Sequence, residues 1–332
     1  MRHGITLPFE PFQGRLFPEL VRAADRFGYT DAWSYESFSS DAFAPIAAAA
    51  MLSDKLRFGC AIIPVFTRPA PLIAMSAVTT NQLAGGRFIL GLGISTPNIV
   101  EQWMGVPFRK PVTMMRETVE ALRAIFRGEK VTMDGKMVKI NGFRLDGPIE
   151  FAPKIYIGAQ GTKMLRLAGE LGDGVIVNFV TPETLPAMLD HTREGMRAAG
   201  KDPSKLDVVC RIMMALGEDA SVARSMLKRA LTAYVTVPQY NKFFQEIGYE
   251  NEAGKAMELW NKGDRKQALE SIPDTMVERI FVYGDAKTCR KRIDEYFTAG
   301  VTTTALQFIS FSQNTEERRA RVLKGMEDFA NA

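Results

Sequence analysis

The residues best suited to holding a ligand are those of a short glycine turn, Gly158-Ala159-Gln160-Gly161. The turn follows the apolar run Lys154–Ile157, which predicts a buried strand, and precedes a run of helical periodicity that begins near Thr162. Glycines let the backbone approach a ligand closely, and the first turn of a helix offers N–H groups and the positive end of the helix dipole. The pattern fits a bound phosphate, and a tight strand–helix turn without a ligand is the competing interpretation.

Other predicted strands end in residues that suit a flat ligand. The residues after the predicted strand Arg87–Leu92 are small and leave room for a ring, and those at the end of the predicted strand Leu56–Pro64 could form a wall behind that ring. At the end of the predicted strand Thr30–Tyr35, aromatic and polar side chains could pack on the ring and bind its edge. The candidate cofactor contacts in these segments are Trp33, Ser37, Cys60, Ala61, Ile62, Gly93 and Ser95. One further candidate, Asn178, lies at the end of the predicted strand that follows the glycine turn. Trp33 could instead belong to the core, Asn178 could cap a turn, and the Gly93 segment could be a flexible loop.

Histidine is too scarce for the commonest side-chain chemistry. The chain contains only His3 and His191, one ahead of the first predicted strand and the other within a predicted helix. A Ser-His-Asp triad, a metal triad or a histidine base therefore cannot be assembled, and no metal is expected. Cys60 lacks a nearby histidine to activate it and is predicted to be a small core residue. Hydride transfer by a bound cofactor is favoured, because the protein then mainly positions the reacting atoms.

The composition is that of an ordinary globular enzyme. A formal net charge of +4 is spread over 332 residues without a long basic run, so nucleic acid is a poor candidate for a partner. The three cysteines are odd in number and far apart, which argues against a disulfide framework and for a reducing compartment. The run Gly4–Phe9 is strand-like rather than a secretion signal, and the longest apolar stretch is too short to cross a bilayer. We expect a cytoplasmic protein with a small-molecule substrate and no membrane partner.

The elements that must position these residues alternate between short β-rich runs and longer helical ones. The predicted strands are Gly4–Pro8, Thr30–Tyr35, Leu56–Pro64, Arg87–Leu92, Lys154–Ile157, Gly174–Phe179, Leu206–Met213 and Thr302–Ile309. Two segments break the rhythm: 130–151 is predicted to form a hairpin, and 217–275 a helical insertion. A short extra strand is predicted at Arg279–Tyr283, and the chain as a whole is interpreted as one domain.

This alternation predicts a parallel sheet, either closed into a barrel or open and doubly wound. A doubly wound nucleotide-binding sheet would favour a G-x-G-x-x-G motif after the first strand, where this chain has Phe9-Glu10-Pro11-Phe12-Gln13-Gly14. The α/β fold is therefore predicted to be a (β/α)8 TIM barrel with a helical insertion. In such a barrel, ligands bind at the C-terminal ends of the strands, which is where the candidate residues lie.

Four stretches of the chain resemble one known family. They are Ile155 to Asn178, Gly85-Gly86-Arg87 with Leu90-Gly91-Leu92-Gly93, Thr67-Arg68-Pro69, and Lys110-Pro111-Val112. Through them the chain resembles the bacterial-luciferase-like monooxygenase superfamily, in the branch that depends on coenzyme F420, a deazaflavin. Within that branch it is most similar to the methylene-tetrahydromethanopterin reductases, and the order of elements agrees over nearly the whole chain.

The resemblance implies where a cofactor would lie. Its phosphate would bind at Gly158 to Gly161, and its ring would rest against a bulge in the third strand. In relatives this bulge contains a non-prolyl cis peptide bond, which would fall near Cys60, Ala61 and Ile62. The implied reaction is hydride transfer at C5 of the deazaflavin, and a homodimer or higher homo-oligomer is expected.

The chain also departs from the family pattern, at the positions concerned with proton transfer. Many relatives have Asp-His after the second strand, where this chain has Glu36-Ser37. The methanopterin reductases have a glutamate where Thr6 aligns and an acidic residue where Thr96 aligns. The candidate catalytic positions are therefore Thr6 and two substitute acids, Glu36 and Glu101. We expect hydride transfer to persist and the substrate to differ from methylene-tetrahydromethanopterin.

Three other functions remain open on the sequence. A reduced-FMN-dependent monooxygenase of the same superfamily is the first, since the cofactor decides the reaction class. A non-catalytic flavin-binding or storage protein is the second, because the usual acidic and histidine positions are missing. A sugar-phosphate enzyme on the same barrel would also explain the phosphate turn, although the third-strand pattern and the lack of histidine count against it.

Overall fold

The computed structural model describes residues 1–7, 17–36 and 41–332, and its central feature is a barrel of parallel strands. Going round the barrel, β12 is followed by β1, β2, β3, β5, β8, β9 and β10, and β10 pairs with β12 again. The strands are β1 (Arg2–Thr6), β2 (Asp31–Ser34), β3 (Arg57–Cys60), β5 (Phe88–Gly93), β8 (Lys154–Gly158), β9 (Gly174–Asn178), β10 (Val208–Leu216) and β12 (Thr303–Phe308). The predicted (β/α)8 barrel is confirmed.

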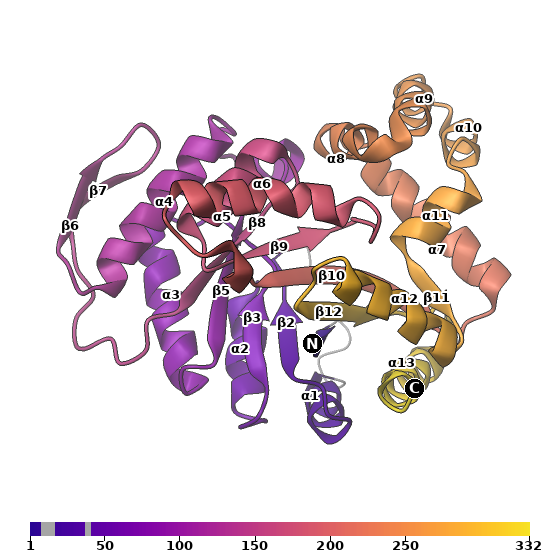
Figure 1. Cartoon of the computed structure of the whole chain (residues 1–332), viewed down its shortest axis with the longest axis horizontal. Helices are drawn as coiled ribbons and strands as arrows, with labels where there is room; N and C mark the ends of the chain where they lie inside the picture. The colour runs from indigo at the N-terminus through magenta and orange to yellow at the C-terminus, as the bar shows by residue number, and fades with distance from the viewer. Residues whose placement is uncertain (8–16, 37–40) are drawn as a thin grey trace. The chain divides into compact units, whose positions relative to one another are not determined.

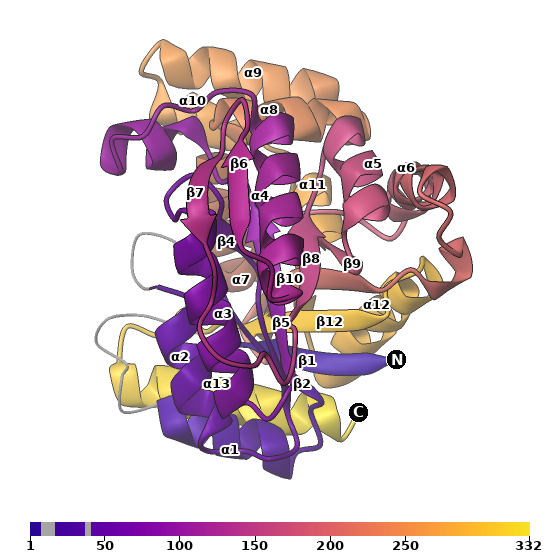
Figure 2. The same cartoon turned by 90° about the vertical axis from the view of Figure 1, so that its left-hand side faces the viewer.

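Helices separate these strands as the periodicity predicts (Figure 1). They are α1 (Phe17–Arg26), α2 (Phe43–Ala50), α3 (Ala70–Leu83), α4 (Pro111–Phe126), α5 (Thr162–Leu171), α6 (Leu185–Ala198), α12 (Ala286–Thr298) and α13 (Thr315–Ala330). Helices α2 to α5 lie side by side in chain order (Figure 2). No helix among the described residues is long and apolar enough to span a membrane.

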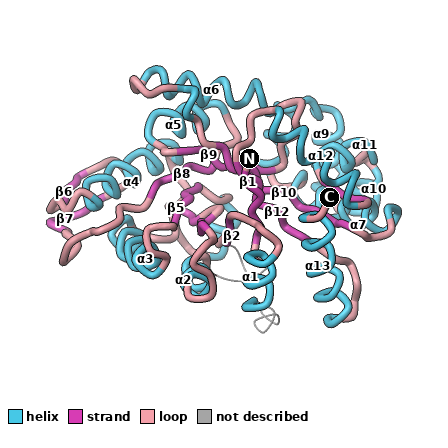
Figure 3. The backbone as a smooth tube through the Cα atoms, turned by 60° about the horizontal axis from the view of Figure 1, so that its bottom comes forward, coloured by secondary structure: helices cyan, strands magenta, loops and turns pink. Residues whose placement is uncertain are grey.

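The chain contacts divide into two compact units. Unit 1 comprises Met1–Val177, Met188–Arg211 and Val301–Ala305, and unit 2 comprises Asn178–Ala187, Ile212–Gly300 and Leu306–Ala332. In unit 1 an antiparallel hairpin, β6 (Val131–Asp134) with β7 (Lys139–Phe143), packs beside α4 (Figure 3). Unit 2 carries α7 (Ala220–Val235), α8 (Pro238–Phe244), α9 (Glu250–Asn261), α10 (Arg265–Glu270) and α11 (Asp274–Ile280).

The structure corrects three predicted element bounds. The third predicted strand is interrupted: β3 ends at Cys60, and a two-residue strand β4, Ile63–Pro64, resumes beside β5. The extra strand begins later than predicted, because α11 continues to Ile280 and β11 is Val282–Gly284. The pair Thr181-Pro182 predicts an N-cap followed by proline at the first helical position, but α6 starts at Leu185, after a turn in which Thr184 N donates to Thr181 Oγ1 at 3.3 Å.

Trp33 fills the interior of the barrel. Its side chain has no exposed surface, and it packs in a core cluster of Ala61, Ile89, Tyr156, Ile176, Val209 and Ala305. A Cβ atom on Gly59 would lie 2.2 Å from the Trp33 ring, so β3 needs glycine where the indole lies against it. Of the two interpretations of Trp33, its complete burial therefore favours the core residue.

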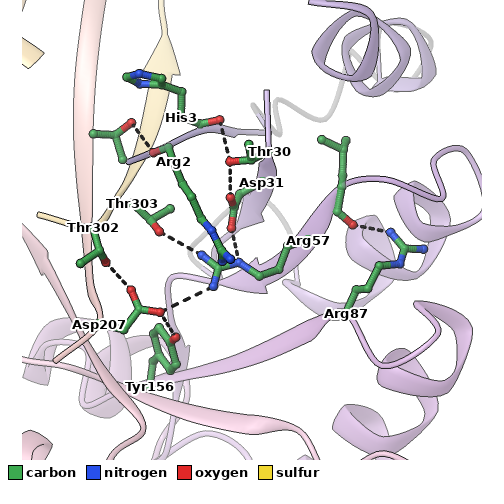
Figure 4. Close-up of polar contacts among 12 residues, drawn as sticks. Arg2, His3, Thr30, Asp31, Arg57, Arg87, Tyr156, Asp207, Thr302 and Thr303 are labelled. Carbon is green, nitrogen blue, oxygen red and sulfur yellow. Dashed lines mark hydrogen bonds and ion pairs between the residues drawn. The ribbon is translucent and has the colours of Figure 1, made fainter. Parts of the chain in front are cut away.

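A charged network joins the N-terminal ends of several strands (Figure 4). Arg57 donates from Nε to Asp31 and from Nη2 to Thr303 Oγ1 at 2.9 Å, and its Nη1 lies 3.6 Å from Asp207 Oδ2. Asp207 also accepts hydrogen bonds from the hydroxyls of Tyr156 and Thr302. Residues of β2, β3, β8 and β12 are tied together with the segment just before β10.

Burial and charge act against each other within this network. Burial alone would raise the pKa of Asp207, but hydrogen bonds from Thr302 and Tyr156, with Arg57 nearby, hold it below its usual range. Burial together with the Asp207 charge raises the pKa of Tyr156, so the phenol stays protonated and donates. The Asp31 side chain has no exposed surface, and its second oxygen accepts from Thr30 Oγ1 at 2.6 Å. Because the carboxylate is cut off from water, it depends on Arg57 for its countercharge.

We predict that Arg57→Met lowers the free energy of unfolding by about 3–5 kcal/mol, because Asp31 is left charged and buried without a partner. Urea denaturation followed by circular dichroism measures this change. The double variant Asp31→Asn with Arg57→Met is the control and should recover part of the loss, since the fully buried charge of Asp31 is then removed as well. An unchanged midpoint in Arg57→Met would show that the network does not stabilise the barrel.

Candidate active site

The third strand breaks at the C-terminal end of the barrel and forms a bulge, Cys60 to Ile62. The Ala61–Ile62 peptide bond is cis, at the position that the family resemblance implies. Ala61 N donates to Ser34 O at 2.7 Å, and Glu36 N donates to Ile62 O at 3.1 Å. The bulge is therefore held by the chain that continues from β2.

Glycines of β5 and β8 make room for the bulge on its other side. A Cβ atom on Gly91 would lie 1.8 Å from the carbonyl oxygen of Cys60, and one on Gly93 would lie 2.4 Å from the Ile62 side chain. At Gly158 the Cβ atom would lie 3.0 Å from Ile62 Cγ2. The partly buried Ile62 side chain thus presents an apolar surface over the small residues of two neighbouring strands.

Cys60 lies beneath this surface as a core residue. Its thiol is fully buried, 3.5 Å from Ser34 Oγ, and burial raises its pKa well above the usual range. A thiol that stays protonated is a poor nucleophile. This agrees with the prediction that Cys60 fills space at the bulge.

The glycine turn leads into a helix whose N-cap residue has no side chain. Gly158 ends β8, and Gly161 occupies the N-cap position of α5 in an extended conformation without a side-chain cap hydrogen bond. The first turn of α5 has no acidic residue, and Lys163 within it is exposed. Ala159 N donates to Ile176 O at 3.0 Å, which fixes the turn to β9. Dipole, backbone N–H groups and a nearby lysine all favour an anion here.

The loop after β5 has a strained residue at its start. Ser95 has φ 60°, in the left-handed region that non-glycine residues adopt at a cost of about 1–2 kcal/mol. Glu101 lies beyond it in the π-helix Asn98–Trp103, is exposed, and accepts from Phe108 N at 3.0 Å. In this structure Glu101 therefore holds the following loop.

Glu36 is held in a bidentate ion pair with Arg68. Arg68 Nε lies 3.1 and 3.0 Å from the two carboxylate oxygens of Glu36, and Arg68 Nη2 lies 2.8 Å from Oε2. The hydrogen bonds to Glu36 raise the pKa of Arg68 above its usual value. Arg68 follows the bulge and Glu36 follows β2, so the pair joins the two segments that flank Ile62. Both carboxylate oxygens of Glu36 are thereby occupied by Arg68.

The remaining predicted site residues are placed as follows. Thr6 is buried, and its hydroxyl donates to Ala305 O at 3.0 Å, within the barrel wall. Ser37 lies outside the described residues. Asn178 is the last residue of β9 and belongs to unit 2, whereas the glycine turn and the bulge belong to unit 1. Among the described residues no group of three or more His, Cys, Asp or Glu side chains could hold a metal ion.

Sequence reasoning missed the charged network around Arg57 and one further arginine, Arg211. The Arg57 network escaped notice because its members come from five separate parts of the chain. Arg211 was missed although it carries a readable signal: it is the single charged residue of the apolar strand β10, VVCRIMMAL. A charged side chain at an inward position of a barrel strand needs an explanation.

We predict that Gly91→Ala lowers the free energy of unfolding by at least about 1–3 kcal/mol, because a backbone carbonyl occupies the place of the new methyl group. Gly161→Ala is the matched control, since no atom lies within 4 Å of its added Cβ atom. That control should stay within about 0.5 kcal/mol of the wild type. Thermal and urea denaturation of both variants test the prediction, and equal stability of the two would contradict it.

Comparison with known proteins places these features in a family. The profile of a family described as luciferase-like monooxygenase matches residues 1–303. The chain is 30% identical over 287 residues to 5,10-methylenetetrahydromethanopterin reductase of Methanolobus tindarius, covering 85% of this chain and 86% of the relative.

Solved structures agree on the fold. The coenzyme F420 dependent tetrahydromethanopterin reductase from Methanopyrus kandleri superposes with a TM-score of 0.79 at 25% identity, over 98% of this chain and 97% of that one. The oxygenating constituent of 3,6-diketocamphane monooxygenase from Pseudomonas putida, solved with FMN, has a TM-score of 0.68 at 17% identity, over 99% and 97%. The second likeness concerns the fold alone.

Proposed function

Because the chain belongs to the luciferase-like monooxygenase family, we propose that it is an oxidoreductase that uses coenzyme F420. It would transfer a hydride between C5 of the deazaflavin and a small organic substrate. The relative from Methanolobus tindarius and the solved structure from Methanopyrus kandleri, both reductases, support this choice of cofactor. The observation that carries the proposal is the bulge at Ile62, seated on glycines beside an uncapped helix start.

The residues present fit such a cofactor. Gly158 lies against Ile62 and is separated from Gly161 by only two residues. The apolar surface of Ile62 and the anion seat, which is the first turn of α5 with Gly161, therefore lie within about 10 Å of each other. A ring joined to a phosphate by a short chain spans that distance. When bound, the deazaflavin supplies the hydride donor or acceptor. Ile62 would shield one face of the ring from water, and the first turn of α5 would hold the phosphate.

We further propose that the substrate differs from methylene-tetrahydromethanopterin. Thr6 replaces the glutamate of the methanopterin reductases, and its hydroxyl is bonded to Ala305 O. Glu36 is ion-paired with Arg68, and Glu101 is bonded to Phe108 N. These contacts give each of the three candidate groups a structural role, which argues against proton delivery to a pterin. Efficient turnover of methylene-tetrahydromethanopterin would contradict this part of the proposal.

We predict that the protein binds F420 at least tenfold more tightly than FMN, a difference of about 1.4 kcal/mol. Quenching of F420 fluorescence and of FMN fluorescence in parallel titrations measures both affinities. Preferential binding of FMN would instead favour the monooxygenase. Tight F420 binding without turnover of any substrate would favour the non-catalytic flavin-binding protein.

The variant Gly161→Asp sharpens this test. An aspartate at the N-cap stabilises a helix, while its negative charge competes with a phosphate for the same N–H groups. We therefore expect F420 binding to weaken without loss of thermal stability, and Gly161→Ala to bind as the wild type does. Equal F420 affinity in Gly161→Asp would show that the phosphate lies elsewhere.

We also propose that two copies of the chain associate through α2 and α3, which lie side by side in unit 1 (Figure 2). Neither helix contains a charged residue, and α3 exposes Leu72, Met75 and Leu83 by 41–46%. A helix that is apolar on its outer face is usually covered. A two-fold interface must match itself, which an uncharged surface does without repulsion.

Met75→Glu tests this interface, because two copies would bring like charges together at the shared surface. We expect light scattering after gel filtration to show a dimer for the wild type and a monomer for this variant. Val222→Glu, at an exposed apolar position on α7, is the control and should leave the mass unchanged. A wild-type monomer, or a Met75→Glu dimer, would contradict the prediction.

A further inference from the structure

Arg211 is an inward-facing arginine at the C-terminal half of the barrel. It lies on β10 two residues after Val209, which belongs to the buried core cluster with Ala61. Side chains two residues apart on a strand share a face, so Arg211 points into the barrel, one layer closer to the strand ends than Val209. Exposure along this face rises from the buried Val209 to the partly buried Arg211, as it should toward the mouth of the barrel.

The Arg211 guanidinium is positioned by an aromatic ring, and no carboxylate of the described residues forms an ion pair with it. It lies over the Tyr35 ring, with Cζ 4.3 Å from the ring centroid, and Tyr35 follows directly after β2. No ion pair of Arg211 occurs among the described residues, and its Nε is buried without a hydrogen-bond partner there. By contrast Arg57, at the N-terminal ends of the strands, and Arg68, after the bulge, each pair with a carboxylate.

Arg211 also faces the bulge across the barrel. From β3 to β10 there are four steps round the barrel in either direction, through β2, β1 and β12 or through β5, β8 and β9. The two strands are therefore diametrically opposite. Any flat ligand that rests on Ile62 presents its open face to the wall that carries Arg211.

We propose that Arg211 is a substrate-binding residue that takes a carboxylate of the substrate. Stacking on Tyr35 occupies the face of the guanidinium, and its two Nη groups form a fork that matches two carboxylate oxygens. Nε is buried without a hydrogen-bond partner among the described residues, and a carboxylate held at the Nη groups would supply the countercharge that the guanidinium lacks there. The inference concerns the anionic group of the substrate and does not depend on which flavin binds.

Malonate, compared with its uncharged analogue malonamide, is the probe for this site. Thermal unfolding at constant ionic strength gives the malonate concentration that produces half of the maximal stabilisation. We expect malonate to stabilise the wild type and malonamide to have no effect. For Arg211→Met the half-maximal concentration should rise by roughly tenfold to a hundredfold, the loss typical of a hydrogen bond to a charged group.

Two further variants separate a specific site from a general effect of charge. Arg144→Met removes an exposed arginine and should respond to malonate as the wild type does. Arg211→Lys keeps the charge but not the fork, so it should bind malonate more weakly than the wild type; this comparison serves if Arg211→Met does not fold. An equal malonate response in wild type, Arg211→Met and Arg211→Lys, or no response in the wild type, would overturn the proposal.

Titration of Arg211→Met with F420 distinguishes this inference from the proposed cofactor. Arg211 lies opposite the bulge, so F420 affinity should be unchanged in the variant. If F420 fails to bind the wild type while malonate binding still requires Arg211, the proposed function is wrong and the carboxylate site stands. If F420 affinity falls and malonate binding does not, Arg211 contacts the cofactor and the carboxylate site is wrong.

Discussion

The carbonyl oxygen of Cys60 occupies the space that a side chain on Gly91 would need. This close contact between backbone and backbone lets the chain leave β3 early, form the bulge and resume as β4 beside β5. Ile62 reaches over Gly93 and Gly158 only because those strands have no side chains in its way. The apolar surface of the candidate active site exists because three positions of the barrel wall lack a Cβ atom.

The two ends of the barrel differ in how their charged groups are compensated. At the N-terminal ends of the strands, Arg57 compensates buried carboxylates and ties strands together in a network that leaves few charges unpaired. Trp33 and its neighbours form a buried layer above it. At the C-terminal ends lie the apolar surface of the bulge, the start of α5 and Arg211, which has no ion pair within the part of the chain that the structure describes. In the proposed function, stability and ligand binding therefore depend on different ends of the same strands.

The glycines illustrate how one residue type serves separate purposes. At Gly91 a neighbouring backbone fills the space, and the residue is needed for packing. At Gly161 the space is open, so an added Cβ atom would meet no neighbouring atom and glycine is not needed for packing. The sequence shows glycine in both places and cannot tell the two apart, because the difference lies in what another strand brings alongside.

The sequence by itself was enough to determine the barrel and the glycine turn, because these follow from local patterns: alternation of strand and helix, and glycine at a strand–helix junction. The place of the bulge was implied by a family resemblance that other stretches of the chain carry. It could not show that Trp33 belongs to the core, that Glu36 is bound to Arg68, or that Arg57 joins Asp31 and Asp207. Each of these depends on residues far apart in the chain meeting when the barrel closes. Arg211 combines both cases: its charge within an apolar strand is visible in the sequence, but only the closed barrel places it opposite the bulge.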